Sequence, residues 1–384
     1  MNVGDILEVD ITGIAHGGHC VARHDGRVIF VRHAIPGERV RIEITDVTSK
    51  FARADATDVL QPSSDRVSPQ CKYAHARGCG GCDFQHVSLE RQRKLKSEII
   101  KDQFSRIGKI EIDIAVEEVK PTQHWRTRVA FSVTPDRKVG FHSSRSDNLI
   151  AISECQISDG AIRIAKINEM RLPVSGRVSA VVDGNGEMDV VIEGRENRSL
   201  VEYEVLGRKY SINPLSFWQS HQKAPELLST IVRDWAEVHS GDHVFDLYGG
   251  VGLFTGALVE SVGKTGRITL IESDSGAVTD ARRNFATDAT VEIVEGSVEK
   301  SIKKYVRADV VIVDPPRSGV GGSTLQSILA LEPRTVVYVS CDPATLARDS
   351  RIAIDRGYRL DQIRALDLFP MTHHIECVAR FIRA

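Results

Sequence analysis

The chain has 384 residues, of which 41% are hydrophobic and 27% are charged, and its formal net charge at pH 7 is −2. This length predicts two or three domains that can each bury a core. No apolar run is long enough to span a membrane, and the first residues lack the basic and apolar regions of a signal peptide. We therefore expect a cytoplasmic protein with no membrane partner.

Residues 1–60 alternate apolar and polar side chains between glycine-rich breaks. Turn signals at 24–27 (His-Asp-Gly-Arg) and 35–38 (Ile-Pro-Gly-Glu) separate the alternating runs. The pattern predicts five short strands, at 6–11, 18–23, 28–32, 38–46 and 51–60. Five strands in such a short segment predict a small OB-like barrel, a fold that often holds nucleic acid.

Cysteines cluster just beyond this segment, after a linker that contains Pro62 and Pro69. Cys71, Cys79 and Cys82 have the spacing C-x7-C-x2-C, and Cys155 is available as a fourth ligand. In a cytoplasmic chain such clustering favours metal binding over disulfides or packing. Structural zinc more often joins two C-x2-C pairs, so the spacing favours an iron–sulfur cluster.

A nucleic-acid partner would need a local basic patch, because the whole chain is slightly acidic. Residues 61–130 contain 13 Lys and Arg against 9 Asp and Glu, and residues 91–96 are the densest part. This run fits RNA contact and a solvated helix face equally well.

The middle of the chain changes from a helical pattern at 86–108 to strands at 127–133, 138–141, 149–152, 174–182 and 189–193. Arg126 and Arg128 alternate with apolar neighbours, which would direct both from one sheet face. That placement suits contact with RNA phosphates, although exposed strand arginines are also common without a ligand.

From residue 211 a helix that runs to about 238 is followed by alternating strands and helices. The strands are expected at 243–247, 267–271, 291–294, 309–313 and 335–339, with two more at 358–368 and 374–382. This alternation predicts an α/β fold with a doubly wound, Rossmann-like sheet. We therefore divide the chain into a barrel (1–60), a central β-rich iron–sulfur domain (61–210) and an α/β domain (211–384).

A glycine-rich turn joins the first strand of that sheet to its helix, and Gly250 and Gly252 would let the backbone approach a ligand closely. A lone turn of this kind could serve a nicotinamide cofactor. S-adenosylmethionine is favoured by Asp246 before the glycines, Glu272 at the end of the next strand and Asp314 in the Asp-Pro-Pro sequence of the fourth.

Cys341 lies where a buried strand, ending at Val339, meets a helix that begins near Pro343. Ligands of open α/β sheets bind at such carboxyl ends of strands. A thiol beside a helix N-terminus tends to have a lowered pKa and to be nucleophilic as the thiolate. The alternative is a buried cysteine that serves as a small hydrophobic residue.

These motifs, in this order, resemble the RNA uracil-5-methyltransferases that carry a TRAM domain and an iron–sulfur cluster. That group acts on 23S ribosomal RNA and, in some members, on the T-loop of tRNA. The resemblance covers nearly the whole chain and includes 217–219 (Phe-Trp-Gln), 314–317 (Asp-Pro-Pro-Arg), 340–343 (Ser-Cys-Asp-Pro) and 374–378 (His-Ile-Glu-Cys-Val).

The resemblance implies Cys341 as the nucleophile and Glu376 as the base, with Gln219, Tyr248, Glu272 and Asp314 holding S-adenosylmethionine. It also implies a 4Fe-4S cluster on the four cysteines, and RNA as the partner of a protein that we expect to be monomeric. The barrel and the cysteine cluster favour ribosomal RNA over tRNA.

Uracil C5 is too weak a nucleophile to take a methyl group directly, which explains why such an enzyme needs these residues. Addition of a thiolate to C6 activates C5, and a base must later remove the C5 proton before the thiol can leave. Three alternatives stay open at this point: a cytosine-C5 methyltransferase, a cluster-bearing RNA-binding protein without turnover, and a nicotinamide oxidoreductase, for which no hydride site is evident.

Overall fold

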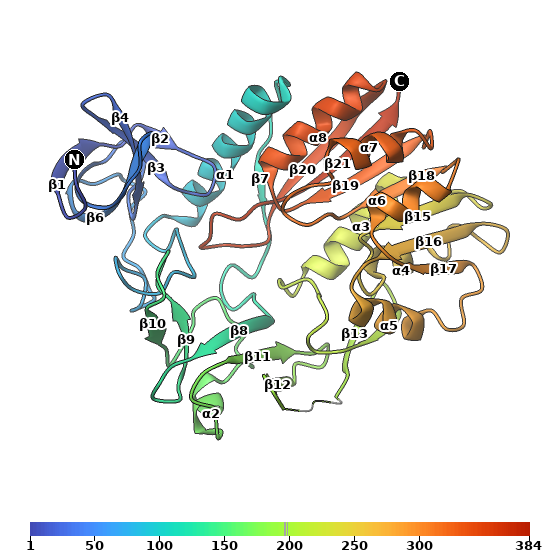
Figure 1. Cartoon of the computed structure of the whole chain (residues 1–384), viewed down its shortest axis with the longest axis horizontal. Coiled ribbons are helices and arrows are strands. Elements are labelled where there is room, and N and C mark those ends of the chain that lie inside the picture. The colour runs from blue at the N-terminus through green and yellow to red at the C-terminus, as the bar shows by residue number, and fades with distance from the viewer. Residues whose placement is uncertain (196, 198) are drawn as a thin grey trace.

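The computed structural model describes residues 1–195, 197 and 199–384. Three bodies make up the molecule: an N-terminal barrel at the left of Figure 1, a central sheet below it and a larger C-terminal sheet at the right. A long helix, α1, lies between the barrel and the C-terminal sheet.

The barrel contains the five expected strands and one short addition, and it packs around a core of its own. Its strand order is β1-β5-β6-β4-β3-β2. The inward residues alternate along each strand, as in β4, where Ile29 and Val31 are fully buried. The strands are β1 (Ile6–Asp10), β2 (Gly13–Ile14), β3 (Cys20–His24), β4 (Arg27–Arg32), β5 (Arg39–Val47) and β6 (Phe51–Gln61).

The helix predicted at 86–108 is two segments, α1 (Leu89–Gln103) and a π-helix, η1 (Phe104–Gly108). The Ser88 side chain caps α1 by accepting a hydrogen bond from the Arg91 backbone N–H. Ile99 and Ile100 of α1 join the core of the C-terminal sheet, and β7 (Val116–Glu118) pairs with the edge of that sheet. Part of the segment that we assigned to the central domain thus packs on the C-terminal one, and the boundary at 61–210 stays a proposal.

The central sheet is antiparallel, with the order β10-β9-β8-β11-β12, and a short helix covers it. Its elements are β8 (Arg128–Val133), β9 (Val139–His142), β10 (Leu149–Ala151), α2 (Ile164–Glu169), β11 (Arg177–Val182) and β12 (Met188–Ile192). A separate hairpin, β13 (Val201–Val205) with β14 (Arg208–Ile212), leads to the C-terminal sheet.

The C-terminal sheet has eight strands in the order β17-β16-β15-β18-β19-β21-β20-β7. Its strands, besides β7, are β15 (His243–Leu247), β16 (Arg267–Glu272), β17 (Val291–Glu295), β18 (Val310–Val313), β19 (Thr335–Ser340), β20 (Tyr358–Asp367) and β21 (Glu376–Arg383). The helices are α3 (Ala224–Ala236), α4 (Leu253–Leu258), α5 (Ser275–Asn284), α6 (Val298–Ser301), η2 (Ile302–Lys304), α7 (Gly322–Leu329) and α8 (Pro343–Asp355).

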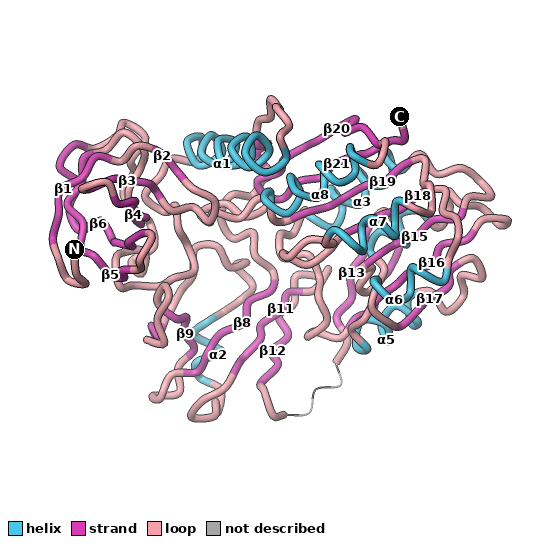
Figure 2. The backbone as a smooth tube through the Cα atoms, turned by 45° about the horizontal axis from the view of Figure 1, so that its top comes forward, coloured by secondary structure: helices cyan, strands magenta, loops and turns pink. Residues whose placement is uncertain are grey.

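Two hydrophobic cores lie on opposite faces of this sheet, which confirms the predicted doubly wound α/β fold. Along β19, Val336 and Tyr338 enter the core beneath α7 and α8, whereas Val337 and Val339 enter the core beneath α3 and α4. Burial on both faces explains why these strands read as continuous apolar runs in the sequence. Figure 2 shows the helices lying against the strands of this sheet. Within the part of the chain that the structure describes, no helix is long and apolar enough to cross a membrane.

Candidate active site

The sheet topology brings Cys341 and Glu376 to the same edge, although 35 residues separate them in the sequence. Strand β21 runs antiparallel to β19, and Ser340 at the end of β19 pairs with Cys377 at the start of β21. Cys341 follows the first of these residues and Glu376 precedes the second. Cys377 itself is fully buried in the core, on the opposite face from Glu376, as strand alternation requires.

The pKa of the Cys341 thiol is raised to about 11, which contradicts the lowered pKa that we expected beside the N-terminus of α8. Burial is the largest cause, and the charges of Glu376 and Asp314 add to it. Arg317 acts in the opposite direction and favours the thiolate. Asp342 does cap the N-terminus of α8, but burial, together with the charges of Glu376 and Asp314, outweighs the effect of the helix on the Cys341 pKa.

A chain of buried carboxyl groups runs across this edge. Burial, and then the charge of Asp314, raises the pKa of Glu376 well above its ordinary value. Burial, and then Asp246, raises the pKa of Asp314 to about 7, while Asp246 itself has a pKa of about 6. Where these carboxyl groups ionise, they make this edge negative, which suits a cationic ligand.

The glycine-rich turn follows β15 and is built from residues in left-handed conformations. Tyr248 has a φ of 60°, Gly250 a φ of 54° and Gly252 a φ of 93°. A Cβ atom at Gly252 would lie 2.2 Å from the ring of Phe285, whereas one at Gly250 would meet nothing within 4 Å. Gly252 is therefore required for packing, and Gly250 presents open backbone to a ligand.

Two carboxylates frame this turn from neighbouring strands. Glu272 accepts a hydrogen bond from the Gly250 N–H at 3.0 Å, so it fixes the turn from the end of β16. Asp246 accepts two bonds from Thr255 through one oxygen, while its Oδ1 is buried without a partner among the described residues. A buried orphan acceptor of this kind is satisfied when a ligand supplies a donor.

Gln219 lies in the segment that precedes α3. Phe217 is 67% exposed, Trp218 stacks on Tyr203 with ring centroids 4.7 Å apart, and Gln219 is buried. Arg128 holds this segment, because its guanidinium donates to the backbone oxygens of Pro214 and Ser216.

Arg128 also donates to the Tyr203 hydroxyl at 3.0 Å, so its donors are used inside the protein. We expected Arg126 and Arg128 to project from one sheet face toward RNA, but only Arg128 lies in a strand, and its contacts are those of a structural clamp. Arg126 is half-buried, and only its Nε donates a hydrogen bond among the described residues, to the Arg128 carbonyl.

The four predicted cysteine ligands, Cys71, Cys79, Cys82 and Cys155, line a single cavity of about 200 Å³. Arg126 lines the same cavity. The Gly81 N–H lies 3.4 Å from the Cys79 sulfur, and the Gln85 side-chain amide 3.6 Å from the Cys82 sulfur. The sequence spacing thus predicted that these four cysteines lie together, and in the structure they line one cavity.

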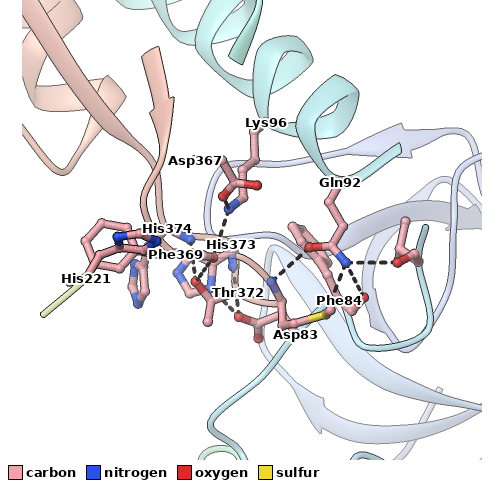
Figure 3. Close-up of polar contacts among 12 residues, drawn as sticks. Asp83, Phe84, Gln92, Lys96, His221, Asp367, Phe369, Thr372, His373 and His374 are labelled. Atoms are coloured by element: carbon pink, nitrogen blue, oxygen red, sulfur yellow. Dashed lines mark hydrogen bonds and ion pairs between the residues drawn. The ribbon is translucent and has the colours of Figure 1, made fainter. Parts of the chain in front are cut away.

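Residues 368–375 form the loop between β20 and β21 that leads to Glu376, and its contacts with Asp83, Gln92 and Lys96 are drawn in Figure 3. No sequence motif predicted these contacts. Asp83, next to Cys82, accepts a hydrogen bond from His373 at 2.6 Å, and Gln92 binds the Met371 backbone N–H at 2.9 Å. Lys96 donates to Asp367 at 2.6 Å and to the Phe369 carbonyl at 3.0 Å. Lys96 is fully buried, so this member of the basic run at 91–96 is neither solvated nor free to contact RNA.

Comparison with known proteins places the two ends of the chain in described families. Residues 1–57 match the TRAM domain, and residues 201–383 match the family described as tRNA (Uracil-5-)-methyltransferase.

The relatives span the whole chain. A protein of Streptomyces coelicolor named as an uncharacterized RNA methyltransferase is 37% identical, with 98% of this chain and 93% of the relative covered. A Corynebacterium glutamicum protein with a similar name is 32% identical, covering 99% and 97%. The crystal structure of Pyrococcus abyssi tRNA (uracil-54, C5)-methyltransferase with S-adenosyl-L-homocysteine has the same fold, with a TM-score of 0.76 at 23% identity over 98% of this chain and 99% of that one. The chain therefore belongs to the family of TRAM-containing, S-adenosylmethionine-dependent RNA (uracil-5-)-methyltransferases and is an enzyme of that class.

Proposed function

We propose that this protein acts as a monomer that methylates C5 of a uridine in 23S ribosomal RNA, through a covalent bond between Cys341 and C6 of the uracil. The observation that carries the proposal is the meeting of Cys341 and Glu376 at one buried edge, beside the cofactor turn. The T-loop of tRNA is the second candidate substrate, because the Pyrococcus enzyme with the same fold acts on tRNA uracil-54. Nucleoside digests of ribosomal and transfer RNA, from cells with and without the gene, separate the two substrates.

The residues divide the chemistry between them. S-adenosylmethionine supplies an electrophilic methyl group when it is bound. The Cys341 thiolate adds to C6, which makes C5 nucleophilic, and Arg317 is the charge that favours this thiolate. After methylation Glu376 removes the C5 proton, and the C6–sulfur bond then breaks to release the base. Because burial raises the pKa of Glu376, its carboxylate, once ionised, is a stronger base than that of an exposed glutamate.

The target uridine must leave its stack to reach this edge, because both reactive groups are partly or fully buried.

The residues at the turn fit S-adenosylmethionine. Gly250 provides the close backbone approach, and Tyr248 belongs to the turn itself. We assign Gln219 to the cofactor from the family resemblance of the Phe-Trp-Gln sequence. The carboxylates Asp246, Glu272 and Asp314 would attract the positively charged cofactor, and the orphan oxygen of Asp246 would accept one of its donors.

RNA contact is best supported at the face of the barrel that turns toward the central sheet. Phe30 and Phe51 meet edge to face, with ring centroids 5.4 Å apart, and the Arg53 guanidinium lies 4.6 Å from the centre of the Phe51 ring. His19 adjoins Phe30, and Arg145, from the turn after β9, lies 3.4 Å from His19. Aromatic rings interleaved with cations suit single-stranded RNA, which stacks its bases and presents phosphates. We retain Arg126 as a second contact and no longer assign Arg128 to RNA.

The cysteine cavity fits an iron–sulfur cluster. Four thiols converge on one space, and two of them receive N–H donors, which is how proteins stabilise cluster sulfurs. Among the described residues, no group of three or more His, Cys, Asp or Glu side chains is arranged to hold a metal ion. From the C-x7-C-x2-C spacing and the shared cavity we propose a 4Fe-4S cluster on Cys71, Cys79, Cys82 and Cys155.

Affinity for S-adenosylmethionine should fall as the pH is lowered from 8 to 5. The pKa of Asp314 is about 7 and that of Asp246 about 6, so protons increasingly neutralise the carboxylates that attract the cation. Each group that must ionise contributes at most about tenfold per pH unit below its pKa. Calorimetry with S-adenosylhomocysteine, which lacks the sulfonium charge, is the control and should show a smaller pH dependence. Identical pH profiles for the two ligands would contradict this electrostatic account.

Cys341→Ala should abolish both methylation and any covalent protein–RNA species, because C5 is never activated. Glu376→Gln retains the thiol but cannot remove the C5 proton, so an adduct that carries the labelled methyl group should accumulate as a slow band on a denaturing gel. Cys377→Ala is the matched control, because that thiol faces the core, and should form and release the adduct normally. Normal turnover by Glu376→Gln would exclude it as the base, and an adduct in Cys341→Ala would reveal another nucleophile.

Arg145→Ala should weaken RNA binding and reduce the slope of log affinity against log salt by about one, because one phosphate contact is lost. Arg307→Ala is the control: this arginine is 81% exposed but lies before β18, at the opposite end of the strand from Asp314. Filter binding at several salt concentrations measures the affinity and the salt slope of each variant. An unchanged slope for Arg145→Ala would place the RNA on another face.

Protein purified without oxygen should be brown and contain about four irons per chain. Serine at any one of the four cysteines should lower the iron content, whereas Cys20→Ala should not, since Cys20 is buried in the barrel and donates to the Ala34 carbonyl. Stoichiometric zinc without iron under these conditions would refute the cluster.

A further inference from the structure

A turn of the barrel reaches the catalytic edge directly. Residues 15–19 join β2 to β3, and the backbone closes this turn through the Ala15 N–H to His19 carbonyl bond at 2.8 Å. At its tip, His16 Nε2 lies 3.0 Å from Asp342 Oδ2. Asp342 follows Cys341, so an N-terminal side chain contacts the residue next to the proposed nucleophile across 326 positions of sequence.

The same turn also contacts the loop that carries Glu376. A Cβ atom at Gly18 would lie 2.3 Å from the Cβ of His373, and Gly18 has a φ of 76°, so only glycine allows this approach. Ile14, just before the turn, packs against the core of the C-terminal sheet. Three separate contacts therefore seat the turn on the methyltransferase domain.

Asp342 divides its two oxygens between the helix and the barrel. Oδ1 accepts hydrogen bonds from the backbone N–H groups of Ala344 at 3.0 Å and Thr345 at 2.9 Å, which caps α8. Oδ2 binds His16. Burial alone would raise the pKa of Asp342, but the bond from His16 and those from the helix outweigh it and leave this pKa lowered. The same bond raises the pKa of His16, so the two groups favour the ion pair.

We propose that the turn at 15–19 forms one wall of the catalytic site, and that His16 is a positioning residue that acts on Cys341 through Asp342. The inference rests on the proposed role of Cys341 as the nucleophile. In this arrangement the imidazolium neutralises the Asp342 carboxylate, whose charge otherwise opposes the Cys341 thiolate, and it fixes the loop that holds the thiol. Because His19 of the same turn belongs to the proposed RNA surface, one short segment joins RNA contact to the reacting sulfur.

The test is the rate at which iodoacetamide alkylates Cys341 in the full-length protein without RNA, followed on the Cys341 peptide by mass spectrometry. His16→Ala should slow alkylation about threefold to tenfold, the change expected when the thiol pKa rises by half a unit to one unit. His16→Gln keeps an N–H donor without the charge and should fall between His16→Ala and the unaltered protein. Asp342→Asn keeps the helix cap, and in that background His16→Ala should have no further effect, because the partner charge is absent.

His24→Ala is the matched control, since His24 is a barrel histidine at the next turn, 3.5 Å from Asp25 and remote from the catalytic edge. It should alkylate at the unaltered rate. Circular dichroism tests whether each variant is folded. If His16→Ala is unfolded, His16→Gln is compared instead, once in the protein with Asp342 and once in Asp342→Asn. Unchanged alkylation in the folded His16 variants would overturn the proposal, and reduced RNA affinity alone would make His16 only an RNA contact. The alkylation rate reports on the Cys341 thiol whether or not the protein transfers a methyl group. Methylation by Cys341→Ala would therefore refute Cys341 as the nucleophile but would leave the measured effect of His16 on its thiol unchanged.

Discussion

The buried ion pair between Lys96 and Asp367 is the contact on which the position of α1 against the C-terminal sheet depends. Both side chains are almost wholly removed from water, and the Lys96 ammonium also binds the Phe369 carbonyl. Burial lowers the pKa of Lys96, while the adjacent Asp367 opposes that effect. Removal of one partner would leave an unpaired charge in the interior, at a cost of about 3–5 kcal/mol. The pair thus fixes α1 against the end of β20, and so fixes the start of the loop that leads to Glu376.

Around this pair the polar contacts are shared between segments that lie far apart in the sequence. Asp83 and Gln92 hold the backbone and side chains of residues 371–373 from one side, and the barrel turn contacts His373 from another. The loop that leads to Glu376 is therefore supported by the cysteine region, the helix and the barrel together. An active site assembled in this way gains precision from residues that never touch the substrate.

The sequence predicted the elements well, and local patterns explain why. Periodicity located the strands of the barrel and of the C-terminal sheet, and the Ser-Cys-Asp-Pro stretch located the junction of β19 and α8 to within a residue. The spacing of four cysteines predicted the side chains that line one cavity. The periodicity and the Ser-Cys-Asp-Pro motif are each set by residues that are close together in the sequence.

The predictions that failed depend on residues from elsewhere in the fold. The raised pKa of Cys341 comes from burial and from the carboxyl groups of Glu376 on β21 and Asp314 just after β18, which no rule about helix termini includes. The sequence alone predicted that Lys96 and Arg128 could contact RNA, because their partners are distant in the chain. In the structure Lys96 binds Asp367, and Arg128 binds the segment at 214–216. His16 carried no signal, because its partner is 326 positions away.

The position of β21 has a consequence for the order in which the protein can assemble. This strand, the last of the sheet in chain order, lies between β19 and β20 rather than at an edge. Before it arrives, β20 and the β7 strand that pairs with it have no ladder joining them to the rest of the sheet. The same insertion that completes the sheet delivers Glu376 to Cys341. A chain without β21 would therefore have an open seam between β19 and β20, and it would also lack Glu376 beside Cys341.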